Sequence, residues 1–140
     1  MINQFIGDYA FLSNFALVKI NHMGRVFTSV ENAYAASKCK YDEDVDKFLN
    51  ITSGQAKRLG RTVAIRDDWE DIKYNVMRDL VFQKFEQEPY KSKLLQTGDL
   101  EIQEGNYWKD TYWGVDLKTG IGKNNLGKIL MEVRESIKGK

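Results

Sequence analysis

The sequence predicts a mainly helical α+β fold, a compact single domain over residues 1–140 with a small β-sheet or hairpin. Apolar residues recur at helical spacing in several segments, most clearly in residues 68–87 and from about Asn124 to Ile137. Apolar and polar residues instead alternate on both sides of a turn within residues 16–28, which is typical of a β-hairpin. With one proline and no low-complexity linker, a chain of 140 residues is the size of one domain.

The first half of the chain is expected to hold the hairpin and three helices. Residues 21–24 form the turn of the hairpin. Ser29 can cap the next helix, which runs to about Cys39, because a serine oxygen accepts a hydrogen bond from an amide of the first turn. Two short helices follow, near residues 43–51 and 53–61.

The second half is expected to be mostly helical. The helix over residues 68–87 carries an apolar stripe, formed by Trp69, Ile72, Val76, Met77, Leu80, Val81 and Phe85. Pro89 can start a short helix that Gly98 ends, and residues 100–104 alternate weakly, as in a strand. The last helix is expected to face inward with Leu126, Ile129, Leu130, Val133 and Ile137.

Charge and composition exclude several classes of protein. The net charge of +1 provides no global field that would recruit nucleic acid or a membrane. A single cysteine, Cys39, excludes an internal disulfide and fits a reducing compartment. The N-terminus lacks the features of a signal peptide and no apolar run is long enough to span a membrane, so we expect a cytoplasmic protein without a membrane partner.

The supply of ligating and nucleophilic residues is also small. One histidine, His22, and one cysteine make a zinc site improbable, and we expect neither a metal nor a cofactor. A Ser-His-Asp arrangement would have to use His22, which is predicted to lie in the hairpin turn. Gly120 and Gly122 do not form a dinucleotide-binding motif because no βαβ context precedes them.

The segment from Asn106 to Gly114, followed by residues 120–127, is the strongest candidate for a binding site. It combines four large aromatic residues with a carboxylate and several glycines, which suits a site for a flat ring linked to a sugar. A buried turn whose tryptophans fill the core is the alternative. Asp110 is either a site carboxylate whose pKa burial would perturb or a turn-forming residue.

A second candidate lies on the helix that Ser29 caps. Glu31, Tyr34, Ala35 and Lys38 share one face there, and the small Ala35 would leave room above the helix between the two charged residues. The alternative is that Glu31 only complements the helix dipole. Other cations have similar alternatives: Lys73 could anchor a phosphate beside Trp69, and the basic run 57–61 could contact phosphates or simply be solvated.

Several of these segments together resemble the NADAR (NAD and ADP-ribose) family. The matching motifs span almost the whole chain in family order: Ser13-Asn14-Phe15, Thr28 to Tyr34 with Lys38, Trp69 through Lys73 to Met77, Lys84-Phe85, Lys109 to Gly114, and Gly120 to Arg134. The resemblance implies a mainly helical domain that cleaves N-glycosidic bonds.

The resemblance also implies roles for individual residues. A Glu after the Thr-Ser pair and an Asp before Tyr-Trp-Gly are the expected catalytic residues, which map onto Glu31 and Asp110. One departure concerns Asn32, since many members carry His there, which puts the substrate preference in doubt more than the chemistry. The expected substrate-binding residues are Asn14, Phe15, Tyr34, Lys38, Trp69, Trp113, Gly114, Gly122 and Asn124.

The expected reaction passes through an oxocarbenium-like transition state at C1 of a ribose. The favoured substrate is an ADP-ribose-linked N-glycoside, such as ADP-ribosylated guanine in a nucleic acid or nucleotide. A phosphoribosylated riboflavin-pathway intermediate is the alternative substrate, and a non-catalytic ADP-ribose-binding module is the alternative function. The partner is accordingly a small N-glycoside or an ADP-ribosylated nucleic acid.

Overall fold

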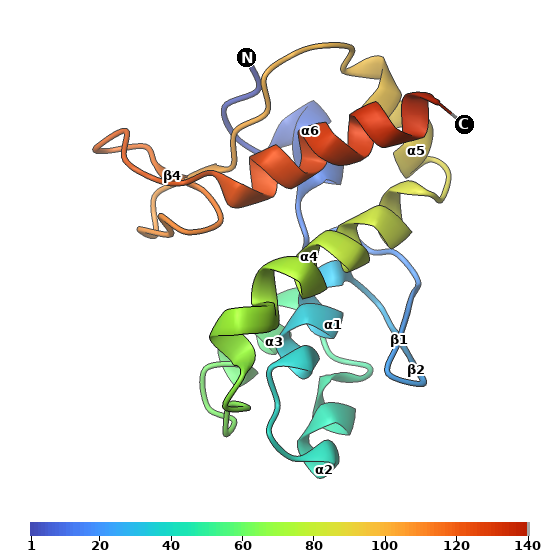
Figure 1. Cartoon of the computed structure of the whole chain (residues 1–140), viewed down its shortest axis with the longest axis vertical. Coiled ribbons are helices and arrows are strands. Elements are labelled where there is room, and N and C mark those ends of the chain that lie inside the picture. Colours follow the sequence, from blue (N-terminus) through green and yellow to red (C-terminus); the bar gives the residue numbers. More distant parts are fainter. Residues whose placement is uncertain (140) are drawn as a thin grey trace. The chain divides into compact units, whose positions relative to one another are not determined.

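The computed structural model describes residues 1–139, which form two compact units by their internal contacts. One unit comprises residues 14–84, and the other comprises residues 1–13 together with the chain from Phe85 onward. Helices dominate, and the strands form two-stranded sheets (Figure 1). The predicted class, mainly helical α+β with a small sheet, is therefore confirmed. Within the described residues, no helix is both long and apolar enough to cross a membrane.

The unit of residues 14–84 begins with the predicted hairpin. Strand β1 (Ile20–His22) pairs antiparallel with β2 (Arg25–Phe27), and the turn between them has positive φ at Met23 and Gly24. Two consecutive left-handed residues match the right-handed twist of a two-residue hairpin. The hairpin is confirmed, although its strands are shorter than residues 16–28.

Four helical segments follow the hairpin, most of them close to their predicted positions. They are α1 (Val30–Ser37), α2 (Asp42–Val45) with a 3₁₀ turn η2 (Asp46–Phe48), α3 (Ser53–Leu59) and α4 (Trp69–Phe85). The predicted helix over residues 43–51 is wrong in its second half, because Leu49 is extended and Asn50 has a φ of 60°. Thr52 and Gln55 then form a capping box that starts α3.

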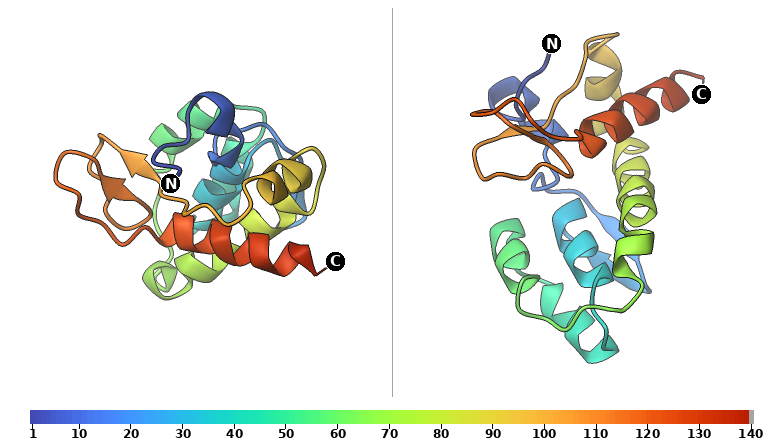
Figure 2. Two further views of the ribbon diagram at one scale, coloured as in Figure 1. Left: turned by 90° about the horizontal axis from the view of Figure 1, so that it is seen from above. Right: turned by 60° about the vertical axis from the view of Figure 1, so that its left-hand side comes forward.

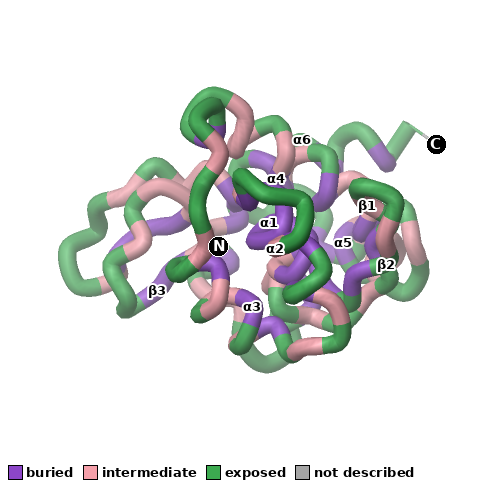
Figure 3. The backbone as a smooth tube through the Cα atoms, turned by 90° about the horizontal axis from the view of Figure 1, so that it is seen from below, coloured by how far each residue is buried: buried purple, intermediate pink, exposed green. Residues whose placement is uncertain are grey.

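Helix α1 is the centre of this unit. Every residue of α1 except Glu31 is buried (Figure 3). Alanines along α1 allow α3 to pack closely against it. On α4, Trp69, Met77, Leu80, Val81 and Phe85 of the predicted stripe are buried, while the other two positions of the stripe are half-buried.

The other unit is built on the C-terminal helix. It contains η1 (Gly7–Leu12), α5 (Tyr90–Gln96), the parallel pair β3 (Gly105–Asn106) and β4 (Val115–Asp116), and α6 (Asn125–Lys138) (Figure 2). The predicted strand over residues 100–104 is wrong: only Ile102 forms an isolated bridge, to Ile2, and the regular pairing starts at Gly105. The sequence analysis missed η1, β3 and β4.

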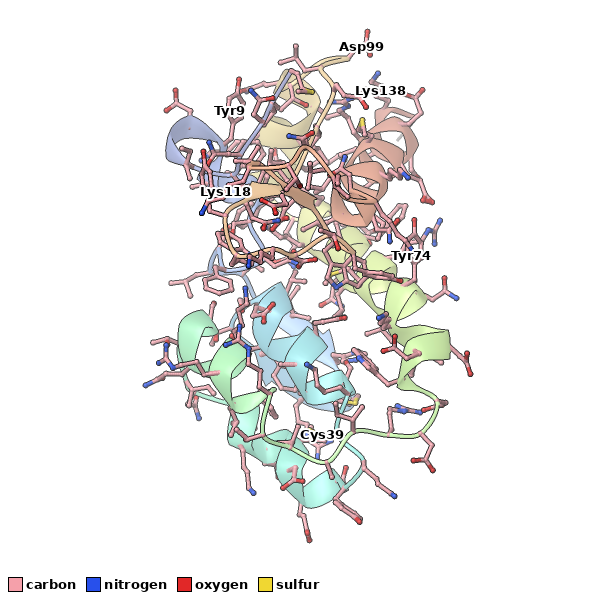
Figure 4. The ribbon with its side chains drawn as sticks, turned by 90° about the vertical axis from the view of Figure 1, so that its left-hand side faces the viewer. Tyr9, Cys39, Tyr74, Asp99, Lys118 and Lys138 are labelled. Atoms are coloured by element: carbon pink, nitrogen blue, oxygen red, sulfur yellow. The ribbon has the colours of Figure 1, made fainter. Side chains whose placement is uncertain are left out.

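Helix α6 buries all five apolar residues predicted to face inward. Burial of each such side chain contributes about 1.5–3 kcal/mol. Its polar side is anchored as well: Arg134, which is 6% exposed, donates to Thr97 Oγ1 at 2.9 Å. At the C-terminal end, Lys138 lies 2.9 Å from the carboxylate of Asp99 (Figure 4). These contacts hold α6 against the segment around α5.

Candidate active site

Glu31 is held at the first turn of α1 by bonds to the backbone and to the helix cap. The Ser29 side chain accepts a hydrogen bond from the amide of Asn32, as the predicted cap requires, and the amide of Glu31 donates to the carbonyl of Asn14 at 3.1 Å. The Glu31 side chain is the one half-exposed position on an otherwise buried helix. A carboxylate in this place is stabilised by the helix dipole and can still meet a ligand.

Asn32, where many family members carry His, does not face a ligand. It is fully buried, and its Oδ1 accepts from the Ser29 hydroxyl at 2.6 Å. Its Nδ2 donates to the carbonyls of Phe48 and Ile51 at 3.0 and 2.9 Å. Asn32 therefore fixes the loop that precedes α3, and the three hydrogen bonds of its side chain serve the fold.

Lys38 is the candidate cationic partner of Glu31. Burial lowers the pKa of the Lys38 ammonium from its usual value, and the negative charge of Glu31 partly offsets that shift. The positive charges of Arg61 and Lys73 lower the Lys38 pKa further. Three cations and one carboxylate thus influence one another here, as expected of a place that receives an anionic group.

The space that Ala35 was expected to leave above α1 is filled by α3. A Cβ placed on Gly60 would lie 3.3 Å from the Ala35 Cβ and 3.4 Å from the Lys38 Nζ. The expectation of open room at Ala35 is therefore wrong, because two helices pack there through their smallest residues. Gly60, which the sequence analysis did not single out, lets the Lys38 amine sit beside α3.

Trp69 packs onto Tyr34, with ring centroids 5.1 Å apart and planes at 54°. The two side chains are only 6% and 9% exposed. Both rings therefore lie mostly in the core, which agrees with the place of Trp69 on the apolar stripe of α4. The neighbouring Lys73 forms an ion pair with Glu70 at 2.8 Å.

Phe15 is more accessible than Tyr34 and Trp69. Its ring is 42% exposed, and the Lys57 Nζ lies 5.8 Å from the ring centroid. The carbonyl of Phe15 lies 3.0 Å from Ser53 Oγ, which is also 3.0 Å from Ser29 Oγ. This polar contact ties the Asn14-Phe15 segment to the starts of both α1 and α3.

Asp110 lies in the other unit and forms a tight turn. Its Oδ1 accepts hydrogen bonds from the amides of Tyr112 and Trp113 at 3.1 and 2.9 Å. This is the turn-forming alternative for Asp110, and it leaves Oδ2 outside these two bonds. The turn orients Trp113, whose half-buried ring meets Tyr112 edge to face at 4.7 Å.

Gly114 and Gly122 allow backbone segments to approach each other. A Cβ on Gly114 would lie 1.7 Å from Glu104 Oε2, and one on Gly122 would lie 2.2 Å from the carbonyl oxygen of Gly114. No side chain larger than hydrogen fits at either position. These glycines close the loops around β4.

The side chain of Asn124 binds the backbone of residues 102–104. Its Oδ1 accepts from the amide of Glu104 and its Nδ2 donates to the carbonyl of Ile102, both at 3.0 Å. The amides of Lys123, Asn124 and Leu126 donate to carbonyls of residues 111–114. The amides at the start of α6 therefore hold the Asp110 turn, which leaves fewer of them for phosphate than the sequence suggested.

His22 lies in β1 rather than in the turn and forms a serine–histidine pair. Its Nε2 is 2.7 Å from Ser37 Oγ, and burial lowers the pKa of His22, an effect that the charge of Asp79 partly offsets. Ser37 is only 3% exposed, and its hydroxyl donates to the carbonyl of Ala33. A nucleophile needs access to its substrate, so this pair is a structural contact.

The remaining candidates for metal or thiol chemistry are poor. Burial raises the pKa of the Cys39 thiol to about 11, which keeps it protonated and unreactive. Among residues 1–139, no three His, Cys, Asp or Glu side chains come together in a way that could hold a metal ion. Glu31 and Asp110 stay the candidate catalytic carboxylates that the sequence analysis predicts.

Comparisons with known proteins show the family to which this chain belongs. The family model of the NADAR domain matches residues 4–138, so the chain belongs to the NADAR family. It is 35% identical to the N-glycosidase YbiA of Escherichia coli, over 93% of this chain and 82% of that protein. It is equally similar, at 35%, to an N-glycosidase of Nostoc punctiforme, over 93% of this chain and 86% of that protein.

Two further comparisons concern the fold and a longer relative. The solved structure of E. coli YbiA covers 99% of this chain with a TM-score of 0.83 and 31% identity, and 87% of that chain is covered. A riboflavin biosynthesis protein of Vibrio vulnificus is 40% identical over 93% of this chain, but the chain spans only 36% of its length. The predicted family and the predicted fold class are both confirmed.

Proposed function

We propose that this protein hydrolyses the N-glycosidic bond of an ADP-ribose-linked substrate and removes ADP-ribose from guanine in a nucleic acid or nucleotide. The N-glycosidase class rests on relatives of that name that match almost the full chain. The structural observation that carries the proposal is the half-exposed Glu31 carboxylate within the electrostatic influence of the Lys38 amine. We propose no cofactor.

The chemistry assigns Glu31 the catalytic role. Positive charge develops at C1 and the ring oxygen as the base departs, so a carboxylate stabilises the transition state or activates the attacking water. Lys38 supplies a nearby amine for a phosphate or ribose oxygen, supported by the positive charge of Arg61 and Lys73. The half-buried Lys38 amine is a hydrogen-bond donor.

Asp110 is assigned the second role, the orientation of ribose hydroxyls or assistance to the leaving base. Its Oδ1 is used by the turn, so Oδ2 is the oxygen that would accept a hydrogen bond from substrate. The ring of Trp113, which the same turn orients, is assigned to stacking on the base or adenine. The partner is then a small N-glycoside or a modified nucleic acid.

A second substrate follows from the V. vulnificus relative, whose name places it in riboflavin biosynthesis. A phosphoribosylated riboflavin-pathway intermediate contains the same kind of N-glycosidic bond, and the same carboxylate would serve. A third possibility, an ADP-ribose-binding module without activity, is disfavoured because both Glu31 and Asp110 are retained.

Mass spectrometry of reaction products separates these functions. The purified protein is incubated with ADP-ribosylated guanosine, an ADP-ribosylated oligonucleotide and a 5-aminouracil-type ribosyl phosphate. Release of free ADP-ribose supports the proposal, whereas release of ribose phosphate from the uracil compound alone supports the riboflavin alternative. Binding of ADP-ribose with no release from any substrate would indicate a binding module.

Charge-removing variants test the two assigned roles. Glu31→Gln keeps size but loses the charge, so turnover should fall by about 10²–10⁴-fold. Glu43→Gln, which removes an exposed carboxylate of α2 in the same unit, is the matched control and should leave turnover unchanged. A well-folded Glu31→Gln protein with turnover close to that of Glu43→Gln would remove Glu31 from the mechanism.

Asp110→Asn can keep the hydrogen bonds of the turn, because the amide oxygen of Asn can still accept from the amides of Tyr112 and Trp113. The turn is then kept while the charge is lost. If Asp110 orients the ribose, the substrate affinity should fall more than the single-turnover rate. Loss of rate with unchanged affinity would move Asp110 into the chemical step.

A further inference from the structure

The loops on either side of β4 carry an aromatic and basic surface that the proposed chemistry does not use. Residues 107–114 connect β3 to β4, and residues 117–124 connect β4 to α6. Both loops extend beyond the N-terminal end of α6 (Figures 1 and 2). Tyr107 and Trp108 are each 59% exposed at the start of the first loop. Exposed rings next to each other are uncommon on a protein surface without a binding function.

The turn that presents these rings is fixed by a buried amide. Asn106, which is 1% exposed, donates from Nδ2 to Glu104 Oε2 and to the carbonyl of Asp110 at 3.0 and 2.9 Å. Its Oδ1 accepts from the amide of Asp110 at 3.1 Å. The Asn106 side chain thus closes the backbone of the Tyr107–Lys109 turn onto Asp110. A backbone fixed in this way loses little conformational entropy when the turn binds a ligand.

The charges of the two loops are segregated. Lys109, Lys118 and Lys123 are exposed, and Figure 4 marks Lys118 on the second loop. Both carboxylates between residues 105 and 124, Asp110 and Asp116, are instead bound through Oδ1 to amides of their own turns. The outer surface is therefore positive although the chain as a whole carries a net charge of only +1.

We propose that Tyr107, Trp108 and the three exposed lysines bind single-stranded nucleic acid. Aromatic rings stack on unpaired bases and lysines contact phosphates, which is the combination that proteins use for single strands. The inference rests on the proposed function and selects a nucleic acid strand, rather than a free nucleotide, as the substrate class.

Because the chain has no global positive field, the affinity for a single strand is expected to be low. Three lysines give a salt slope of about −2 at most for a single strand, so binding is weak and strongly dependent on salt. Stacking on one base contributes a factor of about 5 to 100 in affinity. A duplex keeps its bases stacked on each other and offers these rings no face, so it should bind more weakly.

Fluorescence anisotropy with a labelled, unmodified ten-nucleotide oligo-dT strand at low salt tests the surface without any catalytic step. Trp108→Ala should weaken binding about 10-fold, within the range for one stacked base, and Trp108→Phe should retain most of it. The matched control is Tyr41→Ala, which removes a ring that is 50% exposed and has the Lys40 Nζ 6.0 Å from its centroid. Tyr41→Ala should bind like the parent.

The charge contribution is measured as the salt dependence of the same binding. Lys118→Gln should reduce the slope by about 0.7, and Lys19→Gln, an exposed lysine of the other unit, should not change it. The proposal is overturned if the parent does not bind the strand, if Trp108→Ala and Tyr41→Ala bind equally, or if duplex binds more tightly. Because the strand carries no ADP-ribose, its binding and the hydrolysis assay fail independently.

Discussion

Removal of the Asn32 side chain should destabilise the protein substantially, although the residue is a neighbour of Glu31 and not part of the proposed chemistry. Asn32→Ala breaks one bond from Ser29 and two to the carbonyls of Phe48 and Ile51. The carbonyl of buried Phe48 would lose this partner, at a cost of about 1–3 kcal/mol. Ile51 is half-exposed, so water can reach its carbonyl and the cost there is smaller.

The sum of these losses and of the cavity left by the amide is about 2–4 kcal/mol in the free energy of unfolding. Urea unfolding followed by tryptophan fluorescence measures it. Asn75→Ala, which removes an exposed asparagine of α4, is the control and should change stability by less than about 0.5 kcal/mol. If Asn32→Ala is as stable as Asn75→Ala, the three bonds do not hold the loop before α3.

Asn32→Asp sharpens the test because the size of the side chain is unchanged. A carboxylate would face the two carbonyl oxygens of Phe48 and Ile51, so the folded state should raise the pKa of this new group. The penalty is then complete above the raised pKa, decreases as the pH falls from that value toward the ordinary aspartate pKa, and is absent below the ordinary pKa. The variant should therefore be less stable at pH 7 than at pH 5, relative to the parent.

Three further predictions concern a buried amine, an aromatic ring and metal ions. Burial lowers the pKa of Lys84 to about 7, so the unfolded state binds more protons than the folded state between pH 7 and about 10.5. The stability of the parent protein should therefore rise with pH in that range, by up to about 1.4 kcal/mol per pH unit. Urea titrations at several pH values should show that Lys84→Met lacks this rise. A pH-independent difference between the two proteins would contradict the burial of a titrating amine. Trp113→Ala should weaken ADP-ribose binding by about 1–3 kcal/mol in calorimetry if the ring stacks on a base, and unchanged affinity in a folded variant would exclude that role. Treatment with a strong chelator should leave hydrolysis intact, since the chain has one His and one Cys; activity restored only by zinc or manganese would refute a metal-independent reaction.

Much of the helical structure could be predicted from the sequence because it depends on neighbours within one or two turns. Ser29 caps α1 through an amide three residues away, and the apolar stripe of α6 buries all five of the expected residues. Positive φ at Met23 and Gly24 belongs to a two-residue turn that the alternation on both sides predicts. The segments of the two candidate carboxylates were likewise found from motif order, while their catalytic roles stay predictions.

The features that only the tertiary structure decided depend on partners far along the chain. Strands of two residues, such as β3 and β4, have no periodicity to detect and exist because their backbone groups meet. The amides at the start of α6 bind the carbonyls of the Asp110 turn, so a loop that reads as a phosphate cradle is largely occupied by its own backbone.

Packing also decides which side chains remain for function. Ala35 was expected to leave open space, but Gly60 at the C-terminal end of α3 packs against it, because two small residues allow close approach. Asn32 differs from the family's usual His, yet its partners lie 16 and 19 residues away, so spacing within the motif could not show that it serves the fold. Local rules therefore determined the helices and the motif order, and long-range contacts determined which polar groups are satisfied internally and which remain to meet a ligand.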